Sequence, residues 1–151
     1  MLTFAPMPGV LPSTARAVGI LQGHGELNIH YGLSRLKEKE LDDLKSRMDH
    51  WIAGNDGPAK YFHGFPSRPK HKRCFVFKKG THRFYGFLYH PQPKTNPRFH
   101  ICVLVIYATK KEWETDEAEL DRANQWLNNP NASIAIGEVF SDEKRGKRWT
   151  Q

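Results

Sequence analysis

Two stretches of sequence decide the expected fold: RCFVFKKGTHRFYGFLYH, residues 73–90, and FHICVLVIY, residues 99–107. Both are rich in the aromatic and β-branched side chains that favour strands, and the first is interrupted by the turn sequence KGT at 79–81. We therefore expect strands at 73–78, at 82–90 and across the whole second stretch. Because the connections are short, neighbouring strands are expected to run antiparallel.

Helical periodicity flanks the three expected strands. Apolar residues at helical spacing predict an amphipathic helix over 34–53. A second helix is expected over 116–128, where Asp116 and Glu119 form a capping-box pattern and Pro130 follows the end. These two helices are expected to cover the sheet, since the third strand is apolar on both of its faces.

The length of 151 residues suits one domain with three parts. Residues 1–33 contain Pro and Gly without a sustained period and are expected to form an extended arm. Residues 34–130 form the central unit, and 131–151 form a tail with a strand-like piece at 134–140 and a basic end. The expected fold class is α+β, with an antiparallel sheet of three to four strands packed with two to three helices.

The sequence also bounds the compartment. No apolar run approaches the roughly 18 residues that a membrane span needs, and the start of the chain does not match a secretion signal. We expect a cytoplasmic protein with no membrane partner. Cys74 and Cys102 lie in apolar strand segments, so two buried thiols are expected in place of a disulfide framework.

Charge is distributed unevenly along the chain. Residues 60–111 contain twelve of the 23 Lys and Arg and none of the 16 Asp and Glu. A solvated face can carry such a run without any function. The aromatic rings between these cations favour nucleic acid, because cations bind phosphates and rings stack on bases. We therefore expect the cations to gather on one surface that binds RNA.

Most enzyme motifs are absent from the sequence, including Gly-rich phosphate loops and metal-binding Cys or His pairs. Histidines of the basic segment lack metal-ligand spacing, and nearby cations would repel a metal, so neither a metal site nor a cofactor is expected. The remaining chemistry is attack of an RNA 2′-hydroxyl on the neighbouring phosphorus. It needs a proton acceptor, cations at the phosphoryl oxygens and a proton donor.

The candidate residues for this chemistry fall into two groups. The catalytic candidates are Arg83 and Tyr85, which share a face of the second strand, and Lys110 and Lys111 at a strand-to-helix junction. The RNA-binding candidates are Lys72, Arg73, Lys78, Lys79 and Tyr107. Ordinary core packing explains Tyr85 and Tyr107 equally well, and pairing with a helix acid explains Arg83.

Three sequence segments resemble the RelE/HigB toxin superfamily, in particular its phage-derived HigB-like branch. They are FVFKKG at 75–80, HRFYGF at 82–87 and YATKKEWETDEAELDRA at 107–123. The resemblance implies a RelE-like fold and a toxin of a toxin–antitoxin system that inhibits translation. Its activity would be that of a ribosome-dependent, metal-independent mRNA endonuclease without a cofactor, neutralised by a cognate antitoxin.

The resemblance also implies a set of RNA-contacting cations, namely Lys78, Lys79, Arg83, Lys110 and Lys111. Two other functions remain open on the same sequence. The basic sheet would serve equally well in an RNA- or ribosome-binding protein that does not cleave, and a ParE-like gyrase inhibitor depends less on a cation cluster.

Overall fold

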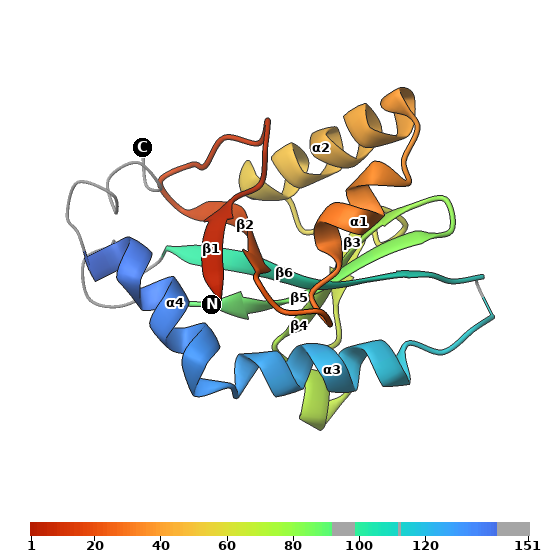
Figure 1. The fold of residues 1–151 in the computed structure, drawn as a ribbon. Coiled ribbons are helices and arrows are strands. Elements are labelled where there is room, and N and C mark those ends of the chain that lie inside the picture. Colours follow the sequence, from red (N-terminus) through yellow and green to blue (C-terminus); the bar gives the residue numbers. More distant parts are fainter. Residues whose placement is uncertain (92–98, 112, 142–151) are drawn as a thin grey trace.

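The computed structural model describes residues 1–91, 99–111 and 113–141. These residues form one mixed sheet of six strands in the order β1-β2-β6-β5-β4-β3, with helices on both faces (Figure 1). The expected antiparallel sheet of three to four strands with two to three helices is therefore wrong. The centre of the sheet is the part that the sequence predicts, and both edges differ from the prediction.

The centre of the sheet consists of β4 (Cys74–Lys79), β5 (His82–Tyr89) and β6 (His100–Thr109). These strands run antiparallel to one another, as predicted, and the register places Lys78 opposite Arg83. β6 is buried along seven successive residues and has helices on both sides, which agrees with its apolar sequence.

The N-terminal residues 1–33 do not form an extended arm. They contain β1 (Thr3–Pro6) and β2 (Arg16–Gln22), and β2 pairs with β6 in parallel, which makes the sheet mixed. The opposite edge is the short strand β3 (Phe62–Gly64). Five successive residues of β2 are buried, as suits a strand covered on both faces, but the surrounding Pro and Gly obscure this run in the sequence.

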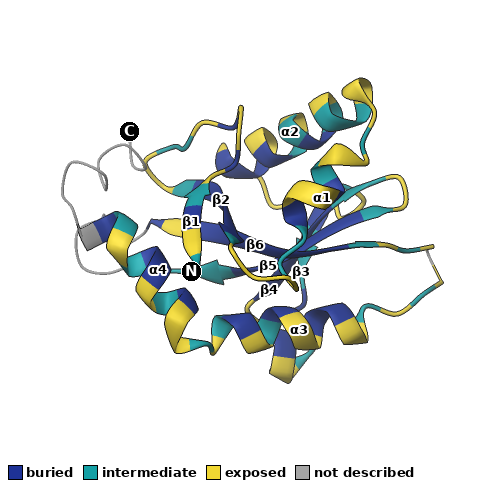
Figure 2. Ribbon diagram, viewed as in Figure 1, coloured by how far each residue is buried: buried dark blue, intermediate teal, exposed yellow. Residues whose placement is uncertain are grey.

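The helices lie on two sides of the sheet (Figure 2). α1 (Ile29–Ser34) and α2 (Glu38–Ile52) pack on one side, which we call the α2 face. α3 (Glu117–Leu127) and α4 (Pro130–Ser141) pack on the other, the α3 face, where the short 3₁₀ turn η1 (Pro69–His71) contacts α3. None of the described helices is both long and apolar enough to cross a membrane.

The helix predictions are confirmed for α3 and corrected elsewhere. The helix expected over 34–53 is present as α2 but begins later, at Glu38, and a separate short helix that the sequence does not predict, α1, ends at Ser34. The strand-like piece at 134–140 is helical, and the buried residues of α4 follow the helical period: Ala132, Ala135, Ile136 and Phe140. Pro130 begins α4, where a missing N–H costs no hydrogen bond. The expected basic end of the tail, 142–151, lies outside the described residues.

Both cysteines are free thiols buried within the sheet, as predicted. Cys74 belongs to the core on the α3 face, and Cys102 belongs to the core on the α2 face. Burial raises the pKa of the Cys74 thiol to about 11, and the charge of Asp121 adds to this effect. Neither side chain therefore offers a reactive thiolate near neutral pH.

Candidate nucleic-acid site

A basic pocket lies where β4 ends, β5 begins and β6 leads toward α3. Its volume is ≈ 400 Å³, and it is lined by Lys60, Lys78, Gly80, Arg83, Lys110, Lys111, Glu114 and Asp116. Five cationic and two acidic side chains give this lining a formal charge of +3. A concave surface of this sign attracts phosphate groups.

The pocket brings together residues that the sequence singles out from separate strands. Lys78 and Arg83 lie opposite each other in the register of β4 and β5, so their side chains share the α3 face. Lys110 and Lys111 come directly after β6. The predicted convergence of cations at the strand-to-helix junction is therefore present in the structure.

Arg83 is the most deeply buried cation of the pocket, with only 8% of its surface exposed. Its Nη1 donates hydrogen bonds to the carbonyl oxygens of Gly80 at 2.6 Å and His82 at 3.0 Å. Among the described residues, no carboxylate lies within ion-pair distance of this guanidinium. A buried charge without a counterion is costly, and a bound phosphate would offset that cost.

The two lysines after β6 differ in their surroundings. Lys110 Nζ lies 2.7 Å from the buried Glu119 Oε1, although the angles are not those of a hydrogen bond. The ammonium of Lys111 has no carboxylate within ion-pair distance in the described parts of the chain, and its Nζ lies 5.7 Å from the centre of the Trp113 ring; only its backbone N–H donates to Glu114. Lys110 is therefore largely neutralised, while Lys111 keeps its charge for a ligand.

Tyr85, a predicted catalytic residue, does not reach the surface of the pocket. Its side chain is fully buried, and its hydroxyl donates a hydrogen bond to Asp116 Oδ1. Burial, followed by this hydrogen bond, raises the pKa of Tyr85 above its usual value. Tyr85 is thus a positioning residue for Asp116.

The predicted capping box at the start of α3 is not formed. Asp116 makes no side-chain cap hydrogen bond, because its carboxylate accepts from Tyr85 instead. Glu119 pairs with Lys110 in place of the backbone. Both acids of the predicted box therefore belong to the polar network around the pocket.

His63 does not line the basic pocket but lies on the same face of the sheet, although the sequence marks it only as a histidine without metal-ligand spacing. In β3 it lies opposite Val76 of β4. Val76 and Lys78 are two residues apart in that strand, so both point to the α3 face. His63 is therefore on the same side of the sheet as Lys78 and Arg83. A strand of three residues carries too little pattern to be recognised in the sequence.

The protonation of His63 suits a proton acceptor. Burial lowers its pKa below the usual 6.5, and the charges of Lys78 and Arg83 lower it further, against the opposite effects of the hydrogen bond to Gly64 and the charge of Asp116. Its Nδ1 lies 2.8 Å from the carbonyl oxygen of Gly64, which can only accept, so we assign the ring proton to Nδ1. Nε2 then keeps a free lone pair at neutral pH.

Two of the predicted RNA-binding residues lie on the opposite side of the sheet. Lys79 follows Lys78 and points to the α2 face, where its Nζ is 2.8 Å from Asp43 Oδ2. Tyr107 also faces α2, and its hydroxyl is 2.7 Å from His82 Nδ1. Neither residue lines the basic pocket.

The expectation that all twelve cations gather on one surface is wrong for the described residues. Lys72 and Arg73 are exposed before the first residue of β4, at the end away from the pocket. Arg68 is 2.7 Å from an acid of α3. Lys94 and Arg98 lie outside the described residues. Acids of α2 and α3, remote in sequence, thus neutralise part of the basic segment.

The fold and this site define an α+β protein with a mixed sheet and a basic pocket at the ends of its central strands. No family model, no curated protein and no solved structure matches the chain. Function is therefore inferred from the chemistry of the site.

Proposed function

We propose that the protein binds RNA in the basic pocket and cleaves it without a metal cofactor. The observation that carries the proposal is the buried Arg83, which has no carboxylate partner among the described residues, on the same face of the sheet as the imidazole of His63, whose pKa the charge of Arg83 helps to lower. These two groups supply the cation and the proton acceptor that attack by a 2′-hydroxyl requires.

Each step of this reaction has a residue near the pocket. Nε2 of His63 accepts the proton of the 2′-hydroxyl as its oxygen bonds to phosphorus. Arg83 and Lys78 bind the phosphoryl oxygens, where negative charge accumulates. The bond to the 5′-oxygen breaks, and the ammonium of Lys60 or Lys111 donates a proton to that leaving oxygen. The products are a 2′,3′-cyclic phosphate and a 5′-hydroxyl.

The sequence resemblance supports a more specific form of the proposal. In this form the protein is a toxin that cleaves messenger RNA on the ribosome and is neutralised by an antitoxin. The support comes from the sequences around the strand ends, above all 107–123. The six-stranded mixed sheet is larger than the sheet that the resemblance implies.

Programmed ribosomes provide the direct test of the proposed reaction. The purified protein is incubated with ribosomes carrying a defined message, and new RNA ends are mapped and analysed chemically. We expect new 5′-hydroxyl ends together with 2′,3′-cyclic phosphates. Intact message under conditions where binding is demonstrated would contradict cleavage and leave an RNA-binding protein.

Trp113 is expected to contribute to binding through stacking on a base. Trp113 is 77% exposed, and the centre of its ring lies 5.7 Å from the Nζ of Lys111, which lines the basic pocket. Because stacking of a base on an aromatic ring is worth about 1–3 kcal/mol, Trp113→Ala should lower affinity for single-stranded RNA by about tenfold. Fluorescence anisotropy at low ionic strength measures the change. Tyr31→Ala, an exposed ring on α1, is the control, and an equal loss there would contradict stacking at Trp113.

The pH dependence of cleavage is expected to reflect His63. Because the folded protein lowers the pKa of His63, the imidazole stays neutral until the pH falls below 6.5. The acid limb of the rate profile should therefore have its midpoint below 6.5, with the rate falling as pH decreases. His63→Gln should remove this limb along with most of the activity. A retained limb in that variant would assign the proton acceptor to another group.

A further inference from the structure

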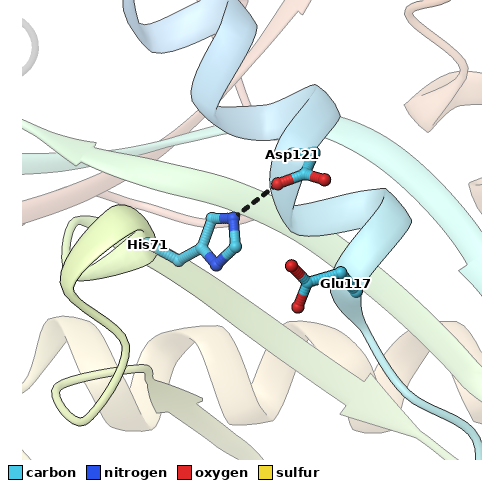
Figure 3. A group of neighbouring side chains, drawn as sticks. All are labelled: His71, Glu117 and Asp121. Carbon is cyan, nitrogen blue, oxygen red and sulfur yellow. Dashed lines mark hydrogen bonds and ion pairs between the residues drawn. The ribbon is translucent and has the colours of Figure 1, made fainter.

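A second group of polar side chains lies outside the basic pocket, where η1 meets α3 (Figure 3). His71 comes from η1, whereas Glu117 and Asp121 are one turn apart on α3. One nitrogen or oxygen atom from each side chain lies within 4.8 Å of the other two. We propose that His71, Glu117 and Asp121 bind a divalent first-row metal ion, of which Zn²⁺ is the best fit.

The local backbone structure preorganises these three side chains. Glu117 and Asp121 are four residues apart in a helix, a spacing that places both carboxylates on one side of it. The η1 turn is closed by a hydrogen bond from the His71 N–H to the Arg68 carbonyl, at 2.9 Å. The His71 side chain is only 3% exposed, so packing restricts its ring.

The orientation of the imidazole favours a shared ligand. Nε2 of His71 points toward α3 and lies 2.8 Å from Asp121 Oδ1. The side chains of Asp121 and Glu117 are 53% and 59% exposed, so an ion can reach them from solvent. A buried nitrogen ligand and two accessible oxygen ligands thus face the same small volume.

The donor set distinguishes between metal ions. Zn²⁺ accepts imidazole nitrogen and carboxylate oxygen, and three protein ligands leave a fourth tetrahedral position for water. Mg²⁺ and Ca²⁺ prefer oxygen ligands and higher coordination numbers. We therefore expect Zn²⁺ to bind more tightly than Mg²⁺ or Ca²⁺.

The nearby positive charge is partly neutralised by α3. Nη1 of Arg68 lies 2.7 Å from Glu117 Oε2, in an ion pair that is open to solvent. Such exposed pairs are weak, so a metal ion can displace the guanidinium. The sequence argument against a metal considered the cations around His71, but the acids that face it come from the helix after β6.

A role without metal also fits the contact between His71 and Asp121. In that case the hydrogen bond only fastens η1 to α3. The Arg68 side chain distinguishes the two possibilities, because its guanidinium competes with a metal for Glu117, whereas the contact of Arg68 with His71 is made by its backbone carbonyl, which a substitution keeps. Replacing Arg68 should therefore affect metal affinity in the direction opposite to the loss of a ligand.

Zinc titration of the full-length protein by isothermal calorimetry tests the proposal, with bound metal counted by elemental analysis. We expect one high-affinity ion per chain. His71→Ala and Asp121→Asn should each lower the affinity by at least tenfold, because each removes a ligand. His100→Ala is the control, since His100 faces His90 elsewhere in the protein with ring centres 5.8 Å apart. Its affinity for zinc at the proposed site should be unchanged.

Two further variants keep the result interpretable if His71→Ala fails to fold. Glu117→Gln changes an exposed side chain and should weaken zinc binding, whereas Arg68→Met should strengthen it. A lower zinc affinity in Glu117→Gln together with a higher zinc affinity in Arg68→Met supports the proposal. Three results would overturn it: no high-affinity zinc binding, equal zinc affinity in all variants, or no increase in zinc affinity in Arg68→Met. RNA cleavage is not part of these measurements, so they remain independent of the proposed function.

Discussion

Replacing Arg83 by methionine is expected to lower the rate of RNA cleavage by about 10²–10³-fold, the usual effect of removing one preorganised donor from a transition state. Methionine has a similar reach but no charge or hydrogen-bond donor. The guanidinium of Arg83 is held by the carbonyl oxygens of Gly80 and His82, so it needs little reorganisation to meet the phosphate. Single-turnover cleavage on programmed ribosomes measures this effect.

Two variants separate the role of Arg83 from general electrostatics. Arg73→Met removes the same charge before β4, away from the pocket, and should retain nearly full activity. Arg83→Lys keeps the charge but loses the planar fork, and is expected to have intermediate activity. Circular dichroism and urea denaturation verify that each variant is folded. Equal losses in Arg73→Met and Arg83→Met would refute a specific role for the pocket.

Gly86→Ala is expected to lower the free energy of unfolding by about 3 kcal/mol, the upper part of the usual range for overpacking. A Cβ at this position would lie 2.1 Å from the carbonyl oxygen of Val103 and 2.8 Å from its carbonyl carbon. These are backbone atoms of the central strand β6, so they cannot turn aside as a flexible side chain would. Urea denaturation followed by circular dichroism measures the change.

The close approach at Gly86 arises from an irregular register. Tyr85 lies opposite Ile106, whereas Gly86 lies opposite Leu104, which indicates a β-bulge in β6. The register shift falls between Gly86 and its neighbour Tyr85. The hydroxyl of Tyr85 donates a hydrogen bond to Asp116, which lines the basic pocket. A shift of the backbone there should therefore reduce cleavage as well as stability.

Gly137→Ala is the matched control for this substitution. A Cβ at Gly137 in α4 would meet no atom within 4 Å. Because Gly costs a helix interior roughly 0.5–1 kcal/mol relative to Ala, this variant should be more stable than the parent protein. The same change thus has opposite signs at Gly86 and Gly137. Similar destabilisation at both positions would show that close contact with β6 is not the cause.

The sequence by itself determined the centre of the sheet and the helix that follows it. Alternating aromatic and β-branched residues with a tight turn predict β4 and β5, and an apolar run predicts β6. These signals are local, since a strand or helix of this length contains its own pattern. The grouping of Arg83, Lys110 and Lys111 also follows from local order, because short antiparallel connections bring their strand ends together.

Only the tertiary structure decided the edges of the sheet, the partners of the cations and the position of His63. β2 pairs in parallel with β6, a strand that is distant from it in sequence. β3 is too short to carry a pattern. Asp43 and Glu117 meet Lys79 and Arg68 because helices pack on both faces of the sheet. Such contacts join residues distant in sequence, so their free energy depends on packing that no local pattern encodes.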